Sequence, residues 1–66
     1  MDPKSLGKKI KVARVEQDLN QTDLAQKIGA NQKSVSRYEN GTTVPSLETM
    51  AKIAKVLKKP VDHFVG

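Results

Sequence analysis

Residues 21–40 read QTDLAQKIGANQKSVSRYEN, and this stretch decides the fold of the 66-residue chain. In its first half, Leu24 and Ile28 recur with helical spacing and form one apolar stripe. Gly29 is expected to end that helix, because glycine readily adopts the left-handed conformation that a helix C-terminus often needs. Asn31 then caps a second helix, since its side chain can accept hydrogen bonds from the amides of a new first turn. The stretch therefore predicts two short helices joined by a tight turn.

The second of these helices, expected over about residues 32–40, has a polar outer face. Its apolar residues, Val35 and Tyr38, share one side. The polar side chains that lie roughly 100° to 200° around the helix from Val35 are those of Lys33, Ser36, Arg37 and Asn40. Gln32 lies beside them in the first turn. Such groups suit nucleic acid, because glutamine pairs with adenine and arginine or lysine with guanine. Taken alone, this helix also fits a solvated surface helix.

The stretch resembles the helix-turn-helix of the lambda-repressor-like family, also called the Cro/repressor or xenobiotic-response-element family. The matching positions are Gln21 at the start of the first helix, Ala25 at the helix crossing, Gly29 in the turn, Val35 in the second helix and Tyr38 near its end. Residues 39–41 and 45–49 are also similar to the family, and the similarity runs from Leu6 to about Phe64. It implies a compact all-α fold of five short helices, with the helix-turn-helix at the second and third.

A first helix is expected from Ser5, its predicted N-cap, to about Gln17, following a frayed arm at residues 1–4. Its core-facing stripe consists of Leu6, Ile10 and Ala13. Val12 and Val15 point away from this stripe, either as ordinary exposed valines or as a contact with a partner. Asp18 stands where the family commonly has glycine, so the following turn is expected to differ.

The rest of the chain completes one domain over residues 1–66. Leu19 is expected to fill the core, and Asn20 to cap the second helix. Ser46 is the predicted cap of a fourth helix over about residues 47–58. The apolar arc of that helix consists of Leu47, Met50, Ile53, Ala54 and Leu57. A last short helix is expected over residues 61–65.

The amino-acid composition limits the kinds of function that the chain can have. Twelve Lys and Arg against seven Asp and Glu give a net charge of +5 and a pI near 9.8, which favours a polyanionic partner. The absence of cysteine excludes disulfides and thiolate metal sites. No apolar run approaches the ~20 residues of a membrane span, so no membrane association is expected. The single histidine, His63, has no nucleophile or metal cluster beside it. We therefore expect no enzymatic activity, no cofactor, no metal and no small-molecule ligand.

The resemblance implies a sequence-specific regulator of transcription, most simply a repressor, in which the third helix enters the major groove of double-stranded DNA. The residues expected to read bases are Gln32, Lys33, Ser36 and Arg37. The residues expected to contact the DNA backbone are Asn20, Gln21, Asn31, Asn40, Thr42 and Thr43. Arg14 and Glu39 are expected to form a structural pair, as in the family. A homodimer on a palindromic operator is also expected. The core is expected to be closed by Val61, Phe64 or Val65, and what these candidate dimer residues leave exposed is the expected dimer surface. Such a protein would be cytoplasmic and nucleoid-associated.

Three alternatives share the fold. It serves as the DNA-binding antitoxin of toxin–antitoxin pairs, and as a controller of restriction–modification genes. It also serves as a protein-bridging transcriptional coactivator. The polar outer face of the third helix argues against the bridging function, whereas the outward-facing Val12 and Val15 favour it.

Overall fold

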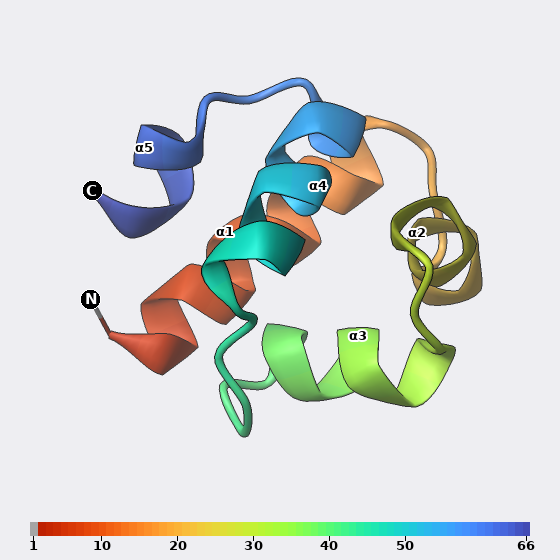
Figure 1. Ribbon diagram of the computed structural model, residues 1–66, viewed down its shortest axis with the longest axis horizontal. Helices are drawn as coiled ribbons and strands as arrows, with labels where there is room; N and C mark the ends of the chain where they lie inside the picture. The colour runs from red at the N-terminus through yellow and green to blue at the C-terminus, as the bar shows by residue number, and fades with distance from the viewer. Residues whose placement is uncertain (1) are drawn as a thin grey trace.

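The computed structural model describes residues 2–66, and these residues form five α-helices. The helices are α1 (Pro3–Glu16), α2 (Gln21–Ile28), α3 (Gln32–Glu39), α4 (Leu47–Leu57) and α5 (Val61–Val65). Helix α1 packs against α3, α2 packs against α3 and α4, and α5 closes on α1 and α4 (Figure 1). The domain measures 25 × 23 × 20 Å. The predicted all-α, five-helix fold is confirmed.

Three of the predicted helix caps are present. The side-chain oxygens of Asn20, Asn31 and Ser46 accept hydrogen bonds from the amide three residues later, at 2.7, 2.8 and 3.1 Å. Each bond satisfies an amide that has no partner within its own helix. Gly29 has φ 72° and ends α2, as predicted. These local signals fix where α2, α3 and α4 begin, and hence how they are spaced.

The predicted start of α1 is wrong. The helix begins at Pro3, not after Ser5, and Asp2 is its N-cap, with its carboxylate 3.4 Å from the amide of Lys4. Proline is well suited to the first position of a helix, because its fixed φ is helical and its missing N–H needs no partner there. Residues 2–4 are therefore ordered at the helix start instead of frayed. Met1, the first residue of the predicted arm, lies outside the described residues.

One core contains side chains from all five helices. Its buried residues are Leu6, Ile10, Ala13, Leu24, Ala25, Ile28, Val35, Met50, Ile53, Ala54, Leu57 and Phe64. Leu19 is partly buried and packs against this core. The prediction was wrong for Leu47, which is 78% exposed. It lies on the same stripe as Met50, but in the first turn of α4, where the helix extends beyond the core.

Helices α1 and α3 approach each other closely at Gly7. A Cβ atom on Gly7 would lie 2.5 Å from the carbonyl oxygen of Glu39 and would also collide with that of Tyr38. No side chain can occupy that space, so only glycine permits this contact. The contact fixes the C-terminal half of α3 against the first half of α1.

The turn between α1 and α2 contains a left-handed residue that is not glycine. Asp18 has φ 57°. Leu19, which follows it, donates its amide to the carbonyl of Arg14, 3.2 Å away. Aspartate thus takes the conformation for which glycine is favoured, and this conformation lets Leu19 turn back toward the core.

Candidate nucleic-acid interface

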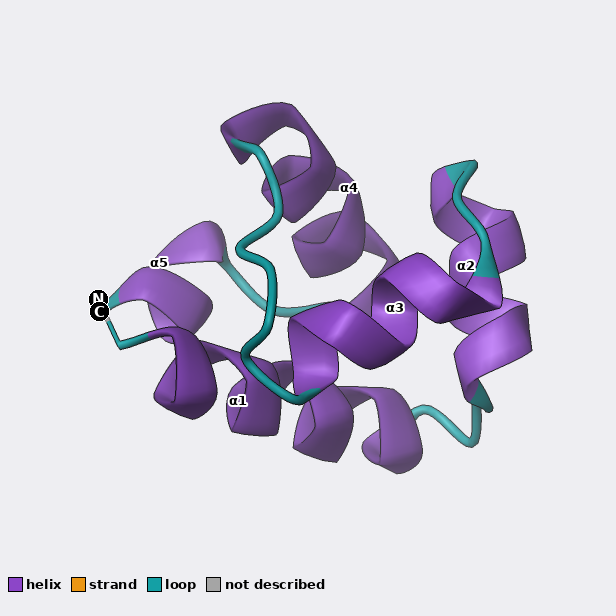
Figure 2. Cartoon of the chain, turned by 90° about the horizontal axis from the view of Figure 1, so that it is seen from below, coloured by secondary structure: helices purple, strands orange, loops and turns teal. Residues whose placement is uncertain are grey.

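Helix α3 presents its polar face to solvent along one side of the molecule. Seen from below, it lies in front of the other helices and runs across the molecule (Figure 2). Val35 is fully buried and anchors the inner side of α3, with Tyr38 partly buried beside it. On the outer side, the side chains of Gln32, Lys33, Ser36 and Arg37 are exposed or half-buried. The four predicted base-reading residues therefore lie together on one accessible helix face.

Both ends of α3 carry asparagine side chains that organise the adjoining loops. Asn31 caps the start of the helix. Asn40 ends it, and the side-chain oxygen of Asn40 accepts hydrogen bonds from the amide and the hydroxyl of Thr42, at 2.9 and 2.5 Å. This arrangement fixes the loop that leads to α4, while the NH₂ group of Asn40 keeps its donors for another partner. Asn40, Thr42 and Thr43 are all exposed.

An ion pair joins α1 to the end of α3. Nε of Arg14 donates to Oε2 of Glu39 at 2.6 Å, and Nη2 donates to Oε1 at 3.0 Å. A third donor of the same guanidinium, Nη1, lies 2.7 Å from the carbonyl oxygen of Leu19. The hydrogen bond to the Glu39 carboxylate raises the pKa of Arg14. Burial lowers this pKa, and the negative charge of Glu39 raises it further. Arg14 therefore remains charged and connects α1, α3 and the turn between α1 and α2.

A chain of hydrogen bonds continues from this ion pair to the outer face of α3. The side-chain NH₂ of Gln21 donates to Oε1 of Glu39 at 3.1 Å. The side-chain oxygen of Gln21 in turn accepts from the NH₂ of Gln32 at 2.6 Å. Because Gln21 donates through its NH₂ group and accepts through its oxygen, the two bonds fix which way its amide points. Gln21, at the start of α2, is thus brought against the first residue of α3.

Lys4 is a basic residue near this surface that the sequence pattern did not indicate. Lys4 lies against Gly41, where a Cβ atom would be 3.1 Å from the Cα of Lys4. The first turn of α1 therefore packs on the loop that follows α3. Lys4 is ordered in the first turn of α1 and does not belong to a frayed arm, and the Asp2-Pro3 pair at the helix start is the local signal for that position.

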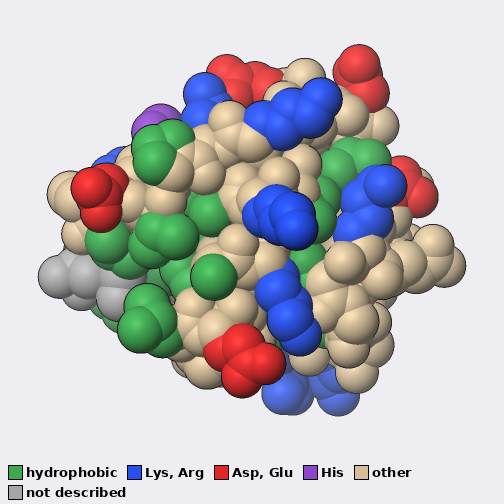
Figure 3. All heavy atoms as spheres, turned by 45° about the horizontal axis from the view of Figure 1, so that its top comes forward, with side chains coloured by type: hydrophobic (Ala, Val, Ile, Leu, Met, Phe, Trp, Pro, Cys, Tyr) green, Lys and Arg blue, Asp and Glu red, His purple; other side chains and the backbone are tan. Residues whose placement is uncertain are grey.

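The candidate dimer region is only partly accessible. Of the three residues expected to close the core, Phe64 does so, and it therefore leaves no surface for a dimer contact. Val61 is half-buried, whereas Val65 is exposed. Exposed Val44 and Leu47 provide further apolar surface. Hydrophobic side chains gather on the side of the molecule on which α5 lies (Figure 3).

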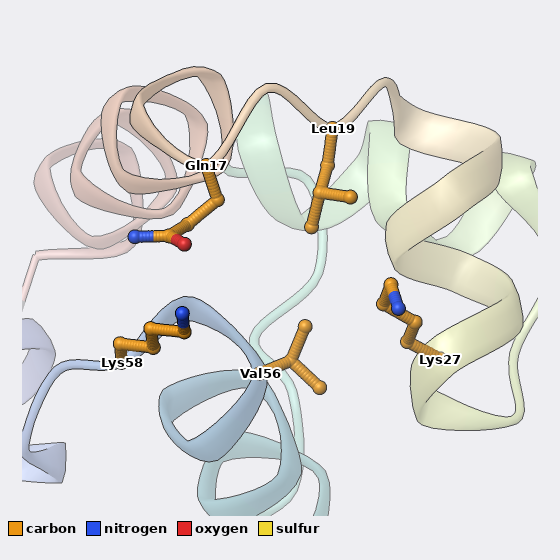
Figure 4. Close-up of a pocket in the computed structure, with 5 residues that line it drawn as sticks. All are labelled: Gln17, Leu19, Lys27, Val56 and Lys58. Carbon is orange, nitrogen blue, oxygen red and sulfur yellow. The ribbon is translucent and has the colours of Figure 1, made fainter.

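A hollow of about 450 Å³ lies away from α3, between the turn after α1, α2 and the end of α4. Its lining side chains come from all three segments, and those of Lys27 and Lys58 point toward it (Figure 4). Lys27 lies in the last turn of α2 and Lys58 caps α4. Cations at helix C-termini are favourable because the carbonyl ends of helices carry partial negative charge. The helix ends thus account for these lysines without a ligand.

No helix within residues 2–66 combines the length and apolar character needed to cross a membrane.

Comparison with known proteins shows the same architecture. The helix-turn-helix family model matches residues 10–64. The transcriptional repressor RstR of a cryptic CTXphi phage of Vibrio cholerae is 44% identical over 88% of this chain and 52% of its own. Antitoxin PezA of Streptococcus pneumoniae is 46% identical over 92% of this chain and 39% of its own. The chain thus spans about half or less of the length of these relatives.

A solved structure gives a close geometric match. Bacillus thuringiensis PlcR, crystallised in complex with the peptide PapR7 and DNA, superposes with a TM-score of 0.87 at 39% identity. The match covers 94% of this chain and 22% of the PlcR chain.

Proposed function

The chain belongs to the helix-turn-helix family, and on this premise we propose that it is a DNA-binding transcriptional regulator. The simplest mode of action is repression by occupying an operator. The similar RstR is a transcriptional repressor, and the similar PlcR was crystallised with DNA. A net charge of +5 on 66 residues adds attraction to a polyanion.

In this proposal α3 enters the major groove and reads bases. The observation that carries it is the hydrogen-bonded chain from Glu39 through Gln21 to Gln32. A side chain that reads a base edge needs a defined orientation, because bidentate pairing tolerates little movement. Gln32 is at the N-terminal end of α3, the part of a recognition helix that lies deepest in the groove. Lys33, Ser36 and Arg37 follow it on the same face.

The surrounding loops and helix ends would contact the DNA backbone. Asn20 caps α2 and Gln21 is its first residue, and the first amides of a helix suit a phosphate oxygen. Asn31, Asn40, Thr42 and Thr43 border α3 with amide and hydroxyl groups that are exposed. Lys4, which packs against Gly41 near this loop, adds a positive charge to the same set. Such contacts set the orientation of α3 without reading sequence.

We further propose that the regulator acts as a homodimer on a palindromic operator. One short helix contacts few base pairs, so a pair of half-sites gives greater specificity. The exposed apolar side chains that a second copy would cover are those of Val44 and Leu47, around the start of α4, and of Val65 at the end of α5. Two recognition helices would then lie about 34 Å apart, one turn of DNA. Binding to chromosomal DNA would make the protein nucleoid-associated.

An antitoxin function is the second candidate, and it is favoured by the similarity to antitoxin PezA. This function would keep the DNA-binding surface on α3 and add a toxin as protein partner. Co-expression with the products of neighbouring genes, followed by co-purification, distinguishes it from a regulator that acts without a partner.

Selection of bound duplexes from random DNA tests the proposed function. We expect the selected pool to converge on a sequence with two related half-sites. A pool that shows no enriched sequence at any salt concentration would contradict sequence-specific binding by α3.

A further inference from the structure

Helix α1 carries an exposed face that the proposed DNA contacts do not use. This valine–lysine face consists of Lys8, Lys11, Val12 and Val15. Val12 and Val15 are 49% and 56% exposed, and both lysines are exposed. Lysines are ordinary on a surface, but two exposed valines one helical turn apart form a continuous apolar strip.

The face is hollowed along its length. One shallow hollow of about 460 Å³ is lined by the four residues of the face together with Glu16. A second, of about 290 Å³, shares Lys8 and Val12 and extends to His63 of α5. The two hollows therefore adjoin and form a trough that starts on α1 and reaches the groove between α1 and α5.

Charge around the trough is predominantly positive. Lys8 and Lys11 flank the valines, and Lys9 lines the part nearest α5. Glu16 is the one acidic residue that lines either hollow, and its carboxylate lies 3.7 Å from Nζ of Lys59. The acid is thus partly neutralised, and the apolar strip has a basic border.

The face is separate from the surface around α3. Helix α1 contacts α3 through Gly7 and Arg14, which are buried, whereas Val12 and Val15 point away from the core. Viewed from below, α3 lies toward the viewer while α1 runs along the lower edge of the domain (Figure 2). Occupation of the trough would therefore leave the outer side of α3 accessible.

We propose that the valine–lysine face binds an acidic amphipathic helical segment of another protein. The apolar side chains of that segment would cover Val12 and Val15, and its carboxylates would lie beside Lys8 and Lys11. A partner with apolar and acidic groups uses both features of the face at once, since burial of the valines is favourable and charge complementarity orients the segment.

Other occupants match the face less well. A second copy would bring the same lysines face to face across a two-fold axis, which costs interaction energy. DNA would meet two exposed valines, which offer phosphates no hydrogen bond. A lipid surface would gain little from an apolar strip of two valines on one helix.

Titration of the ¹⁵N-labelled full chain with a synthetic peptide tests the proposal. The probe is a helical 16-residue peptide with leucine along one face and glutamate on either side, compared with a scrambled peptide of equal composition. We expect amide shifts centred on residues 8–16 and His63, and at least tenfold weaker binding of the scrambled peptide. Double substitution Val12→Ser and Val15→Ser should weaken binding at least tenfold, with the helical amide pattern retained.

Matched charge variants and competing ligands complete the test. Lys8→Glu with Lys11→Glu should abolish binding, whereas Lys52→Glu with Lys55→Glu, the same charge change on α4, should weaken it less than threefold. Polyglutamate that binds as tightly as the amphipathic peptide would overturn the proposal, because the valines would then contribute nothing. Peptide-induced shifts centred outside residues 8–16 would also overturn the proposal. So would shifts at residues 8–16 that appear with phosphatidylglycerol vesicles or duplex DNA but not with the peptide.

Discussion

Arg14 and Glu39 form a bidentate ion pair that joins the first helix to the last residue of the third. The Arg14 and Glu39 side chains are only 10% and 4% exposed. Since Glu39 also accepts from Gln21, the same carboxylate supports the glutamine that contacts Gln32. A structural pair thus has a functional consequence, because it holds the residue at the start of the proposed reading face.

Replacement of this carboxylate should destabilise the fold. We expect Glu39→Ala to lower the free energy of unfolding by about 3 kcal/mol, because the buried guanidinium of Arg14 loses its partner. Urea denaturation followed by circular dichroism measures the change. The control is Glu48→Ala, whose carboxylate is 85% exposed and 4.0 Å from Lys52, with an expected loss of about 0.5 kcal/mol or less. Equal losses in both variants would contradict the structural function of the Arg14–Glu39 pair.

Alanine substitutions on α3 should separate base reading from general attraction. We expect Gln32→Ala and Lys33→Ala each to cost about 1–3 kcal/mol on the specific site and to relax preference at one base position. Lys52→Ala and Lys55→Ala on α4 should cost less and affect all duplexes alike. Binding to specific and scrambled duplexes at two salt concentrations measures both effects. An unchanged specific-to-scrambled ratio for the α3 variants would show that α3 is not the reader.

The contact at Gly7 predicts an unusual response to alanine. Alanine normally stabilises a helix interior by about 1 kcal/mol relative to glycine. Here the added methyl group would meet the backbone carbonyls of α3, so we expect Gly7→Ala to destabilise the domain by about 2 kcal/mol or more. Thermal melting measures this change, with Lys8→Ala on the exposed side of the same turn as a near-neutral control. A Gly7→Ala variant that melts at or above the wild-type temperature would refute the close approach.

Exposed apolar residues at the start of α4 and at the end of α5 should control dimerisation. We expect Leu47→Glu and Val65→Glu to prevent formation of the two-protomer complex on a palindromic duplex, because a charge would be buried without a partner. Sedimentation of protein with a full operator and with one half-site gives the stoichiometry. Gln26→Glu, at an exposed neutral position on α2, is the control for a single added acid. A single protomer that saturates a full palindrome would exclude the dimer.

The left-handed aspartate offers a site for stabilisation. We expect Asp18→Asn to raise the free energy of unfolding by about 0.5–1 kcal/mol. Asparagine tolerates the left-handed conformation well, and the change removes a negative charge just after the C-terminus of α1. Asp62→Asn, in the first turn of α5 where a negative charge is favourable, should instead be neutral or slightly destabilising. Comparison of the two denaturation midpoints decides between these outcomes.

Apart from the start of α1, the sequence alone determined the local architecture of this protein. The caps at Asn20, Asn31 and Ser46 and the stop at Gly29 act over three or four residues, so their hydrogen bonds can be predicted from neighbours in the chain. The polar face of α3 follows in the same way from helical spacing around Val35. These signals were sufficient to predict the helix-turn-helix and the surface that it presents.

Only the tertiary structure decided how the helix ends meet. Leu47 and Phe64 both belong to apolar patterns, but Phe64 is buried whereas Leu47 is exposed. Helical periodicity shows which face of a helix a side chain is on, but it does not show whether another helix packs over that part of the face. The contact of Gln21 with both Glu39 and Gln32 depends on positions that lie up to 18 residues apart in the chain. Such contacts exist because packing brings separate helix ends within hydrogen-bonding distance, and no local pattern of residues fixes that distance.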